Sequence, residues 1–371
     1  MKETRRIHAN WTILLAIALL GSCSYQRSST GDRDQVSAGR SLETSARACE
    51  AKSHLKFTSG VRAIFEDSRG RFWFGSHQEG VALCDGREFT YYTVKDGLSD
   101  NQVRTIQEDQ AGVLWFETGN GITSFDGNTF KIHTGKSNGL LHPDQADTWR
   151  SAAGDLWFHG DGGMRRGFDG QGVYRYDGRS LSYLALPLPE TADKENPYLV
   201  TDIVKGRDGT VWIATFPAVF KYDGHSFTVI SDETVGIEPG SERLHVRSIF
   251  EDSRGNLWIG NNGLGVLRYN GQTVSNFTHE HAPSIREKGP SHSLDRIFSI
   301  AEDATGNIWF GTRDNGAWRF DGKSLTNFTT EDGLTSHMVW TIYRDKRGAL
   351  WFGMGDGSVS RFNGDSFHRV Y

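Results

Sequence analysis

Apolar and polar positions alternate over short stretches along most of the chain, and each stretch ends in a cluster of turn-forming residues. Residues 246–252, VRSIFED, run into the turn SRGN, and LWIG follows as a second short apolar run. GVLRYNG then alternates again, and its Asn-Gly turn leads into TVSNF. Because alternation with a period of two is the pattern of half-buried strands, this unit predicts a four-stranded antiparallel sheet.

The unit recurs along the chain at a nearly regular interval. In each copy a Trp stands three residues after a Gly, and these residues are Trp73, Trp115, Trp157, Trp212, Trp258, Trp309 and Trp351. One such sheet cannot bury both of its faces alone, so the copies must stack on one another. Repeats of about 40 to 50 residues with four strands each are typical of propellers. The predicted fold class is therefore all-β, a seven-bladed β-propeller of four-stranded antiparallel blades.

The repeated Trp and a Gly that follows it are expected to be structural. Each Trp falls on the second strand of its unit, where a large ring can fill the wedge between neighbouring sheets. The Gly two residues later predicts a close approach between backbones. Glu117 and Ala214 replace that Gly in the second and fourth copies, and the third copy, TWRSAAGDLWFHG, is degenerate.

The repeats resemble those of the two-component regulator propeller family. The resemblance covers residues 61–371 and rests on VRSIFEDSRGNLWIG at 246–260, DGLSDNQ at 96–102 and DGLTSHM at 332–338. It implies a propeller of the kind found in the periplasmic sensor regions of bacterial hybrid histidine kinases. In those sensors paired propellers, a further β-domain, a membrane helix and a kinase follow, and we expect no signalling output from the sequence given, which ends at Tyr371.

The amino terminus has the pattern of an export signal. Three basic residues precede WTILLAIALL, an apolar run too short to span a bilayer and typical of a signal-peptide core. The run leads into LGSC at residues 20–23, which resembles a bacterial lipobox with Cys23 as the lipidated first residue of the mature protein. Ser24 resembles the sorting signal of Gram-negative outer-membrane lipoproteins, and ordinary cleavage nearby is the alternative.

These features predict the organisation of the chain and the place where it works. A signal peptide at 1–22 is followed by a flexible, polar tether at 23–53 that begins with lipidated Cys23, and a propeller occupies 54–371. The expected location is the cell envelope, with the lipid anchor holding the protein to a membrane. A formal net charge of −5 and a pI near 6.2 argue against a nucleic-acid partner.

The cysteines allow one disulfide in an exported protein. Once Cys23 carries lipid, Cys49 and Cys84 remain, and an even remainder favours a bond between them. That bond would join the end of the tether to the third strand of the first blade. Cys84 replaces the aromatic residue of other copies, so a buried free thiol is the alternative.

The second residue of each innermost strand is expected to approach the mouth of the axial channel. These residues are Arg62, Arg104, Ala146, Thr201, Arg247, Phe298 and Trp340. Three guanidinium groups beside two aromatic rings are suited to hold a carboxylate or sulfate while a ring stacks on Trp340. The predicted ligand-binding residues are therefore Arg62, Arg104, Arg247, Phe298 and Trp340. The residues that follow them, Ala63, Thr105, Asp147, Asp202, Ser248, Ser299 and Thr341, are mostly small or short, as a crowded axis requires.

A structural role for the same arginines is the alternative. Glu66, Glu108 and Glu251 stand at the other end of the innermost strands of their blades. Pairing of each arginine with an acidic residue of a neighbouring blade would assign the guanidinium groups to the scaffold. The two interpretations differ in whether loss of an arginine lowers ligand affinity or stability.

Inserted loops supply the remaining candidate chemistry. The long insertions, at 160–171, 184–199, 231–244 and 277–295, are expected at one face of the ring, where binding loops tend to lie. The last of them carries His279, Glu280, His281 and His292. An H-x-H phrase can chelate a metal, but further ligands would be needed, so a solvated loop is the favoured interpretation and no metal or cofactor is predicted.

The function favoured by the sequence is ligand or protein binding outside the cytoplasm. The expected partner is an unknown small molecule, an anionic glycan fragment or a protein that the propeller senses or recruits. The alternative is an extracytoplasmic enzyme that uses the His-bearing inserted loops, because seven-bladed lyases that open cyclic antibiotics have a similar overall shape. Fold alone does not decide between them.

Overall fold

The computed structural model describes residues 54–134, 151–160, 172–189, 197–238, 241–289 and 292–371. All of them belong to the compact unit Ser45–Tyr371, which is distinct from Met1–Thr44. The predicted signal peptide, tether and lipidated Cys23 lie outside the described residues. The described part of the chain forms seven antiparallel sheets, each built from strands that are consecutive in the sequence.

The strands follow the predicted repeats. Blade one holds β1 (Val61–Glu66), β2 (Phe72–Ser76), β3 (Val81–Cys84) and β4 (Phe89–Tyr92), and blade two holds β5 (Val103–Glu108), β6 (Leu114–Thr118), β7 (Gly121–Phe125) and β8 (Phe130–Ile132). Blade three holds β9 (Leu156–His159), β10 (Gly172–Tyr176) and β11 (Leu181–Ala185), and blade four holds β12 (Val200–Lys205), β13 (Val211–Thr215), β14 (Ala218–Tyr222) and β15 (Phe227–Ser231).

The last three blades repeat the same order. Blade five holds β16 (Val246–Glu251), β17 (Leu257–Asn261), β18 (Val266–Tyr269) and β19 (Val274–Asn276), and blade six holds β20 (Ile297–Glu302), β21 (Ile308–Thr312), β22 (Ala317–Phe320) and β23 (Leu325–Phe328). Blade seven holds β24 (Val339–Arg344), β25 (Leu350–Met354), β26 (Val359–Phe362) and β27 (Phe367–Arg369). Short helices α3 (Phe277–Glu280) and α4 (Ala282–Glu287) and the 3₁₀ turn η1 (Thr330–Asp332) complete the described elements.

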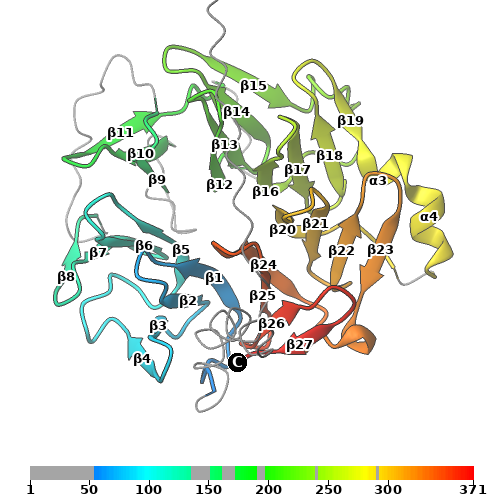
Figure 1. Cartoon of the computed structure of the whole chain (residues 1–371). Coiled ribbons are helices and arrows are strands. Elements are labelled where there is room, and N and C mark those ends of the chain that lie inside the picture. The colour runs from blue at the N-terminus through cyan, green and yellow to red at the C-terminus, as the bar shows by residue number, and fades with distance from the viewer. Residues whose placement is uncertain (1–53, 135–150, 161–171, 190–196, 239–240, 290–291) are drawn as a thin grey trace, which may run out of the picture. The chain divides into compact units, whose positions relative to one another are not determined.

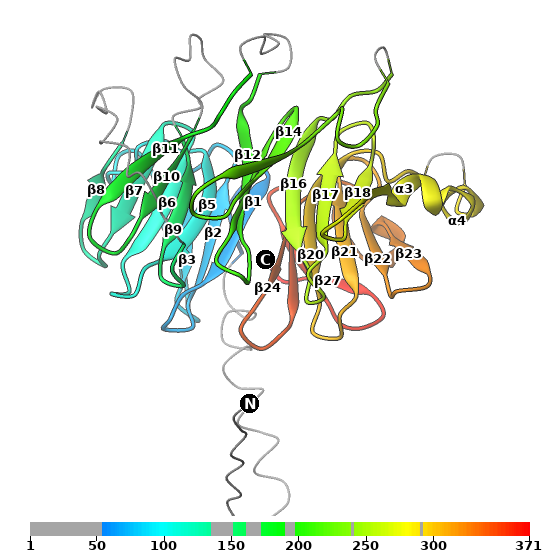
Figure 2. The ribbon, with the colours of Figure 1, turned by 90° about the horizontal axis from the view of Figure 1, so that it is seen from above.

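The sheets form a ring about a common axis. In Figure 1 the innermost strands β1, β5, β12, β16, β20 and β24 surround the centre of the ring, and Figure 2 shows the same ring turned by 90°. The predicted seven-bladed propeller is confirmed. Six sheets show all four strands, and the third shows three because its predicted innermost strand, with Ala146 and Asp147, lies outside the described residues.

The repeated Trp is held by a repeated carboxylate. In five blades the indole Nε1 donates a hydrogen bond to the Asp six residues before it, and the pairs are Trp73–Asp67 at 2.9 Å, Trp115–Asp109 at 2.9 Å, Trp258–Asp252 at 2.8 Å, Trp309–Asp303 at 3.0 Å and Trp351–Asp345 at 2.8 Å. The same Asp accepts backbone N–H groups of the turn, as Asp252 does from Arg254 and Asn256. One side chain therefore closes the turn and satisfies a buried indole.

The Gly that follows each Trp lies where two blades touch. A Cβ added to Gly75 would come 2.7 Å from Val103 Cγ1, and one on Gly260 would come 2.6 Å from Ile297 Cγ2. Each of these contacts is with the first residue of the next blade's innermost strand. At these positions the Gly therefore makes room for a side chain of the next blade, and the contact is not one between two backbones, since real Cβ atoms do not approach so closely.

Blade seven meets blade one without sharing a strand. Glu66 accepts a hydrogen bond from the backbone N–H of Lys346 at 2.9 Å, and the Lys346 ammonium donates to the carbonyl of Asp67 at 2.6 Å. Residues 54–59 form no described strand, but Leu55 and Phe57 are buried in a cluster with aromatic side chains of blade seven. The ring is thus closed by packing and side-chain bonds between the first and last blades.

No helix among the described residues is both long and apolar enough to cross a membrane.

Candidate functional site

A β-bulge places the predicted ligand-binding residues. In all six described innermost strands the pairing register shifts around the second residue, as it does between Val61 and Ala63 and between Val246 and Ser248. The residues at these shifts are Arg62, Arg104, Thr201, Arg247, Phe298 and Trp340. Because a bulge leaves one residue unpaired and re-aims its side chain, the same local irregularity serves the site six times.

The bulge residues meet in one cavity on the axis. Its volume is about 430 Å³, and Arg62, Arg104, Thr201, Arg247, Phe298 and Trp340 all line it. The structure therefore brings together the five residues predicted to bind ligand, and their binding role stays a prediction. At about 30 Å³ for each water molecule, the cavity has room for roughly 14 waters. That volume falls within the usual size of small-molecule sites.

Two adjacent aromatic rings lie between two guanidinium groups along one wall of this cavity. The Arg62 guanidinium carbon lies 4.6 Å from the centroid of the Trp340 ring, and the Arg247 carbon lies 5.3 Å from that of Phe298. Phe298 and Trp340 contact each other edge to face, with centroids 5.5 Å apart. Cation–π contacts of this kind hold a guanidinium in place while its N–H groups stay available to an anion.

The arginines are close enough to affect one another. Burial, followed by repulsion from Arg104 and Arg247, lowers the pKa of Arg62 to about 10, although Glu117 opposes the shift. Burial and then Arg62 and Arg104 also lower the pKa of His77, whose Nδ1 lies 3.4 Å from Arg62 Nη1. The cavity is therefore a region of concentrated positive charge in a protein whose net charge is negative.

Pairing of these arginines with acidic residues does not occur in the described part of the chain. None of the seven salt bridges there involves Arg62, Arg104 or Arg247. Glu108 instead accepts hydrogen bonds from the backbone N–H and hydroxyl of Ser68 in blade one, both at 2.7 Å. Such glutamates clamp the turn of a neighbouring blade, and the guanidinium groups form no salt bridge with a carboxylate among the described residues.

Sequence reasoning missed a buried carboxyl–imidazole pair beside the cavity. Glu117 and His159 stand two residues after their tryptophans, where most blades have Gly, and Glu117 Oε1 lies 2.5 Å from His159 Nδ1. Burial opposes the charged form of Glu117, but attraction to His159 and then to Arg104 outweighs it and holds the pKa of this carboxyl below its ordinary value. The signal in the sequence was the replacement of the Gly by a large polar residue at two successive copies.

Asp202 is the second buried carboxyl at the cavity. It follows the bulge residue of β12 and lines the cavity wall. Its oxygens accept backbone hydrogen bonds from Ile249 and Ile203, both at 2.9 Å. Burial nevertheless raises the pKa of Asp202 above its ordinary value, because it outweighs these bonds and the attraction of His159.

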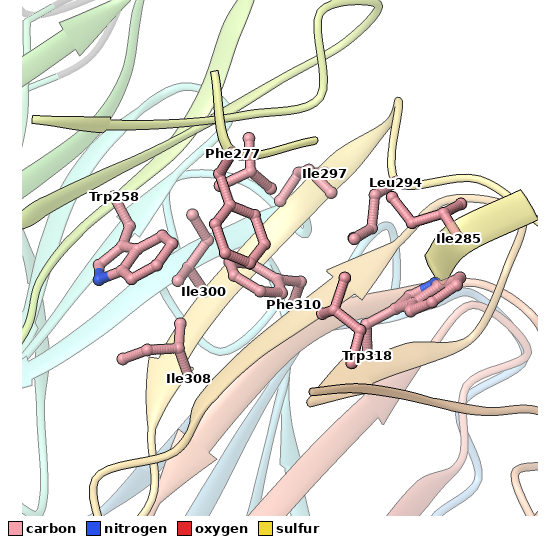
Figure 3. Close-up of a cluster of buried hydrophobic side chains, with 11 residues drawn as sticks. Trp258, Phe277, Ile285, Leu294, Ile297, Ile300, Ile308, Phe310 and Trp318 are labelled. Atoms are coloured by element: carbon pink, nitrogen blue, oxygen red, sulfur yellow. The ribbon is translucent and has the colours of Figure 1, made fainter. Parts of the chain in front are cut away.

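Of the histidines in the last insertion, His281 packs against the core of blades five and six, whereas His279 is exposed. Figure 3 shows Phe277 of α3 directed between Trp258 and Phe310, and its ring lies 5.1 Å and 5.6 Å from theirs. The His281 ring packs on Phe277 with centroids 4.1 Å apart, and its Nδ1 lies 3.0 Å from the Phe277 carbonyl. His279 and Glu280 lie in α3 itself. This part of the insertion was expected to be a solvated loop, and it is instead a pair of short helices held by aromatic packing.

The other insertions contribute little to the cavity. Leu199 is the sole described residue of the four insertions that lines it. Residues 161–171 and 190–196, with parts of the other insertions, lie outside the described residues. Among the residues that the structure does describe, no group of three or more His, Cys, Asp or Glu side chains is arranged to hold a metal ion.

Cys84 is buried on β3 and is disulfide-bonded. Its predicted partner Cys49 lies outside the described residues, as does Cys23. The pairing of Cys84 with Cys49 therefore stays a prediction.

A second hollow of about 550 Å³ lies between blades two and three. Its aromatic side chains already contact one another, since the Trp115 ring lies 4.2 Å from Tyr176 and 4.5 Å from His133. His133 Nε2 also bonds to the Ser124 hydroxyl at 2.8 Å. The axial cavity offers more unpaired chemistry and is the stronger candidate site.

Sequence comparison identifies the repeats. Five segments, at residues 56–78, 97–120, 241–263, 291–314 and 333–356, match the family model described as two component regulator propeller. A segment of 45 residues is 47% identical to histidine kinase P4 of Formosa agariphila, and it covers 12% of this chain and 3% of that protein.

Solved structures share the fold. The extracellular domain of a putative hybrid two-component system from B. thetaiotaomicron is similar with a TM-score of 0.62 and 20% identity, over 85% of this chain and 40% of that one. The extracellular domain of a putative one component system from the same organism has a TM-score of 0.58 and 22% sequence identity, over 84% of this chain and 39% of that one. Virginiamycin B lyase from Staphylococcus aureus has a TM-score of 0.61 and 18% sequence identity, over 84% of this chain and 97% of that one.

These comparisons bear on the repeats and the fold. The chain spans about two fifths of the length of the two sensor domains and a small fraction of the kinase. Identities of 18% to 22% to the solved structures show a shared architecture and nothing finer. The matched segments fall on the repeats from which blades one, two, five, six and seven are built. The chain is a seven-bladed propeller, and five of its segments match the two component regulator propeller model.

Proposed function

We propose that this protein is an extracytoplasmic binding propeller that senses or recruits a small anionic ligand in its axial cavity. The observation that carries the proposal is the convergence of three buried or half-buried guanidinium groups with no carboxylate partner among the described residues. Two aromatic rings hold the guanidinium groups of Arg62 and Arg247 in place. An acidic glycan fragment fits this chemistry, since it offers both an anion and a ring.

The location in the proposal rests on the amino-terminal sequence and on the resemblance of the repeats to those of sensor regions. Lipid on Cys23 would hold the propeller to the membrane through the tether at 23–53. Replacing Cys23 by Ala should move the protein from the detergent phase to the aqueous phase in a partition experiment. A Cys23→Ala protein that stayed in the detergent phase would exclude this anchor.

The binding test compares affinity with stability in the same preparations. Arg104→Ala and Arg247→Ala should each weaken binding of an acidic disaccharide by about 1.5 to 3 kcal/mol, roughly ten- to a hundredfold, because a charge-assisted hydrogen bond is lost. The free energy of unfolding should change less than the affinity, since neither arginine forms a salt bridge with a described residue. Added salt should weaken binding to the original protein through screening.

Arg87→Ala provides a control with the same change of charge. Arg87 is exposed in the hairpin between β3 and β4, and its backbone N–H bonds to Asp85 at 2.8 Å. This variant should bind like the original protein. Loss of stability with unchanged affinity in the two cavity variants would assign their arginines to the scaffold.

The enzyme alternative depended on the inserted histidines. His281 packs on Phe277 and Phe320, and neither His279 nor His281 lines the axial cavity. The similarity to virginiamycin B lyase is one of fold. The positions of these histidines therefore favour a binding function over an enzymatic function that uses the inserted loops.

A further inference from the structure

The axial cavity has two sides of unlike chemistry. Among the described residues, blades one, two and three line it with polar side chains alone, and these are Arg62, His77, Gln102, Arg104, Thr105 and His159. Blades four, six and seven line it with half-buried apolar side chains, which are Leu199, Val200, Phe216, Phe298 and Trp340. We call the first group the polar side of the cavity and the second group its apolar side.

Hydrogen bonds between side chains tie the polar side together. Arg104 Nε donates to Gln102 Oε1 at 3.2 Å, and Gln102 Nε2 and Arg62 Nη1 each lie 3.4 Å from His77 Nδ1. Because a guanidinium can only donate, His77 Nδ1 is the acceptor and the proton of the neutral ring is on Nε2. Each guanidinium has five N–H groups, and these bonds use one on Arg62 and one on Arg104. The polar side is therefore rich in hydrogen-bond donors.

Several polar atoms next to the apolar side are not open to a ligand. The hydroxyl oxygens of Thr201 and Ser299 each expose less than 1 Å². The Asp202 oxygens accept the backbone N–H groups of Ile249 and Ile203, both at 2.9 Å. The surface offered by these blades is therefore mainly that of their apolar side chains.

Arg247 of blade five brings one positive charge to the apolar side. Its guanidinium carbon lies 5.6 Å from the centroid of the Phe216 ring and 5.3 Å from that of Phe298. Apolar surroundings keep water away and so strengthen the attraction between a charge and a bound anion. An anion that reaches Arg247 therefore has aromatic surface beside it.

A hydroxylated ligand is poorly matched to the apolar side. Each hydroxyl that leaves water without gaining a new partner costs free energy. An apolar ring has no such cost, and removal of its surface from water favours binding. An acidic glycan fragment shares the anion, but it carries hydroxyls around its ring. The apolar side therefore favours an anion whose body has few hydroxyls.

We propose that the ligand is an aromatic carboxylate, whose anion binds to the arginines and whose ring lies against the apolar side. The inference rests on the proposed function, because it keeps the same anion-binding groups and specifies what else the ligand carries. Three of the five residues of the apolar side are aromatic, namely Phe216, Phe298 and Trp340. Contacts between aromatic rings stabilise beyond the area that they bury, so an aromatic body fits better than an aliphatic one.

Four probes separate the two sides of the cavity. 2-Naphthoate carries an anion and an aromatic body, glucuronate is a uronate with the anion on a hydroxylated ring, acetate carries the anion alone, and 2-naphthamide carries the aromatic body alone. Titration calorimetry at one salt concentration should show a single molecule of 2-naphthoate binding at least about tenfold tighter than glucuronate or acetate. 2-Naphthamide should bind about tenfold or more weakly than 2-naphthoate, because it lacks the charge-assisted hydrogen bonds.

Variants assign the preference to the apolar side. Phe298→Ala removes one of its rings and should reduce the preference for 2-naphthoate over glucuronate by about tenfold. Leu199→Asn should reduce the same preference, and it serves where Phe298→Ala fails to fold, because Leu199 precedes β12 and belongs to no described core cluster. Ile132→Asn is the matched control, a similar change at an exposed position of β8 that does not line the cavity, and it should leave the preference unchanged.

The outcomes distinguish the aromatic ligand from the anion site. Glucuronate or acetate bound at least as tightly as 2-naphthoate, or a preference that survives both variants, overturns the aromatic ligand and leaves the anion site standing. 2-Naphthamide bound as tightly as 2-naphthoate overturns the anion site, and the carboxylate with it, and leaves an aromatic site. Failure of all four probes to bind overturns both.

Discussion

A single aspartate accepts several hydrogen bonds in the turn between the first two strands of a blade. Asp252 Oδ1 accepts the backbone N–H groups of Arg254 and Asn256, and Oδ2 accepts the Asn256 amide and the Trp258 indole, all at 2.8 to 2.9 Å. Burial disfavours its charged form, but these bonds outweigh burial and hold the pKa of Asp252 below 3.8. The carboxylate thus links the turn to the interior of the sheet.

Removing this carboxylate should be costly. Asp252→Ala leaves the buried Trp258 N–H and two backbone groups without their acceptor, and we expect a loss of about 3 kcal/mol in the free energy of unfolding. Urea unfolding followed by tryptophan fluorescence measures it. Asp85→Ala is the control, because Asp85 caps an exposed hairpin and is bonded to two backbone N–H groups. A loss at position 252 no greater than that at position 85 would contradict the role given to the indole bond.

His77 reports on the charge of the cavity. Burial, Arg62 and Arg104 hold its pKa below 6.5, so the ring is neutral at pH 7. An anion bound by these arginines offsets their charge, and the pKa of His77 should rise when the ligand binds. By linkage, the affinity of the protein for the anion should then increase as the pH falls through the pKa of His77 in the bound state. An NMR titration of the His77 ring with and without a bound uronate measures the shift, and a pKa that the ligand leaves unchanged would place the anion elsewhere.

At the scale of the element, the spacing between blades depends on one missing methyl group. A Cβ on Gly260 would lie 2.6 Å from Cγ2 and 2.8 Å from Cβ of Ile297 on the next blade. Gly260→Ala should therefore cost about 1 to 3 kcal/mol of stability through overpacking. Thermal and urea unfolding measure the change.

A second substitution shows whether the cost arises at that contact. In the double variant Gly260→Ala with Ile297→Ala, the clash with Cγ2 is removed. The double variant should therefore lose less stability than the two single variants lose in total. Strict additivity would mean that the cost of the new methyl group arises elsewhere.

The elements differ in how far local sequence could predict them. The Gly-x-x-Trp spacing predicts the blades because each unit repeats its own turn residues. The phase of the innermost strand also correctly predicts that Arg62, Arg104 and Arg247 line the same cavity. The bulges were not predicted, since a register shift depends on two strands together. The Glu117–His159 pair was missed because it joins strands of different blades, and α3 was missed because its position depends on aromatic packing around Phe277.

At the scale of the whole molecule, the ring has one seam at which the joined blades come from opposite ends of the propeller sequence. Phe57 and Leu55 pack beside Trp351 and Tyr371, and Glu66 bonds to Lys346 across the seam. These contacts replace the shared strand by which a propeller could otherwise be closed. As at the other boundaries between described blades, no strand pairing joins the two blades of the seam, which is held by side-chain packing and hydrogen bonds.

Weakening this seam should open the ring locally before it unfolds. Phe57→Ala should cost about 3 to 5 kcal/mol if the cavity it leaves does not collapse. Amide hydrogen exchange measured by mass spectrometry should rise first in β1, β24 and β25. Phe227→Ala in blade four is a control of the same residue type away from the seam, and faster exchange spread evenly over all blades in Phe57→Ala would contradict a local opening.

The bulge in each innermost strand separates two demands on adjacent residues. In the six innermost strands that the structure describes, the residue before the bulge is Val or Ile, and the residue at it is Arg, Thr, Phe or Trp in different blades. Folding thus fixes the first position and leaves the second free to vary. The six bulge residues could therefore be substituted by design to change which ligands the cavity binds, while the blades that form the cavity are kept.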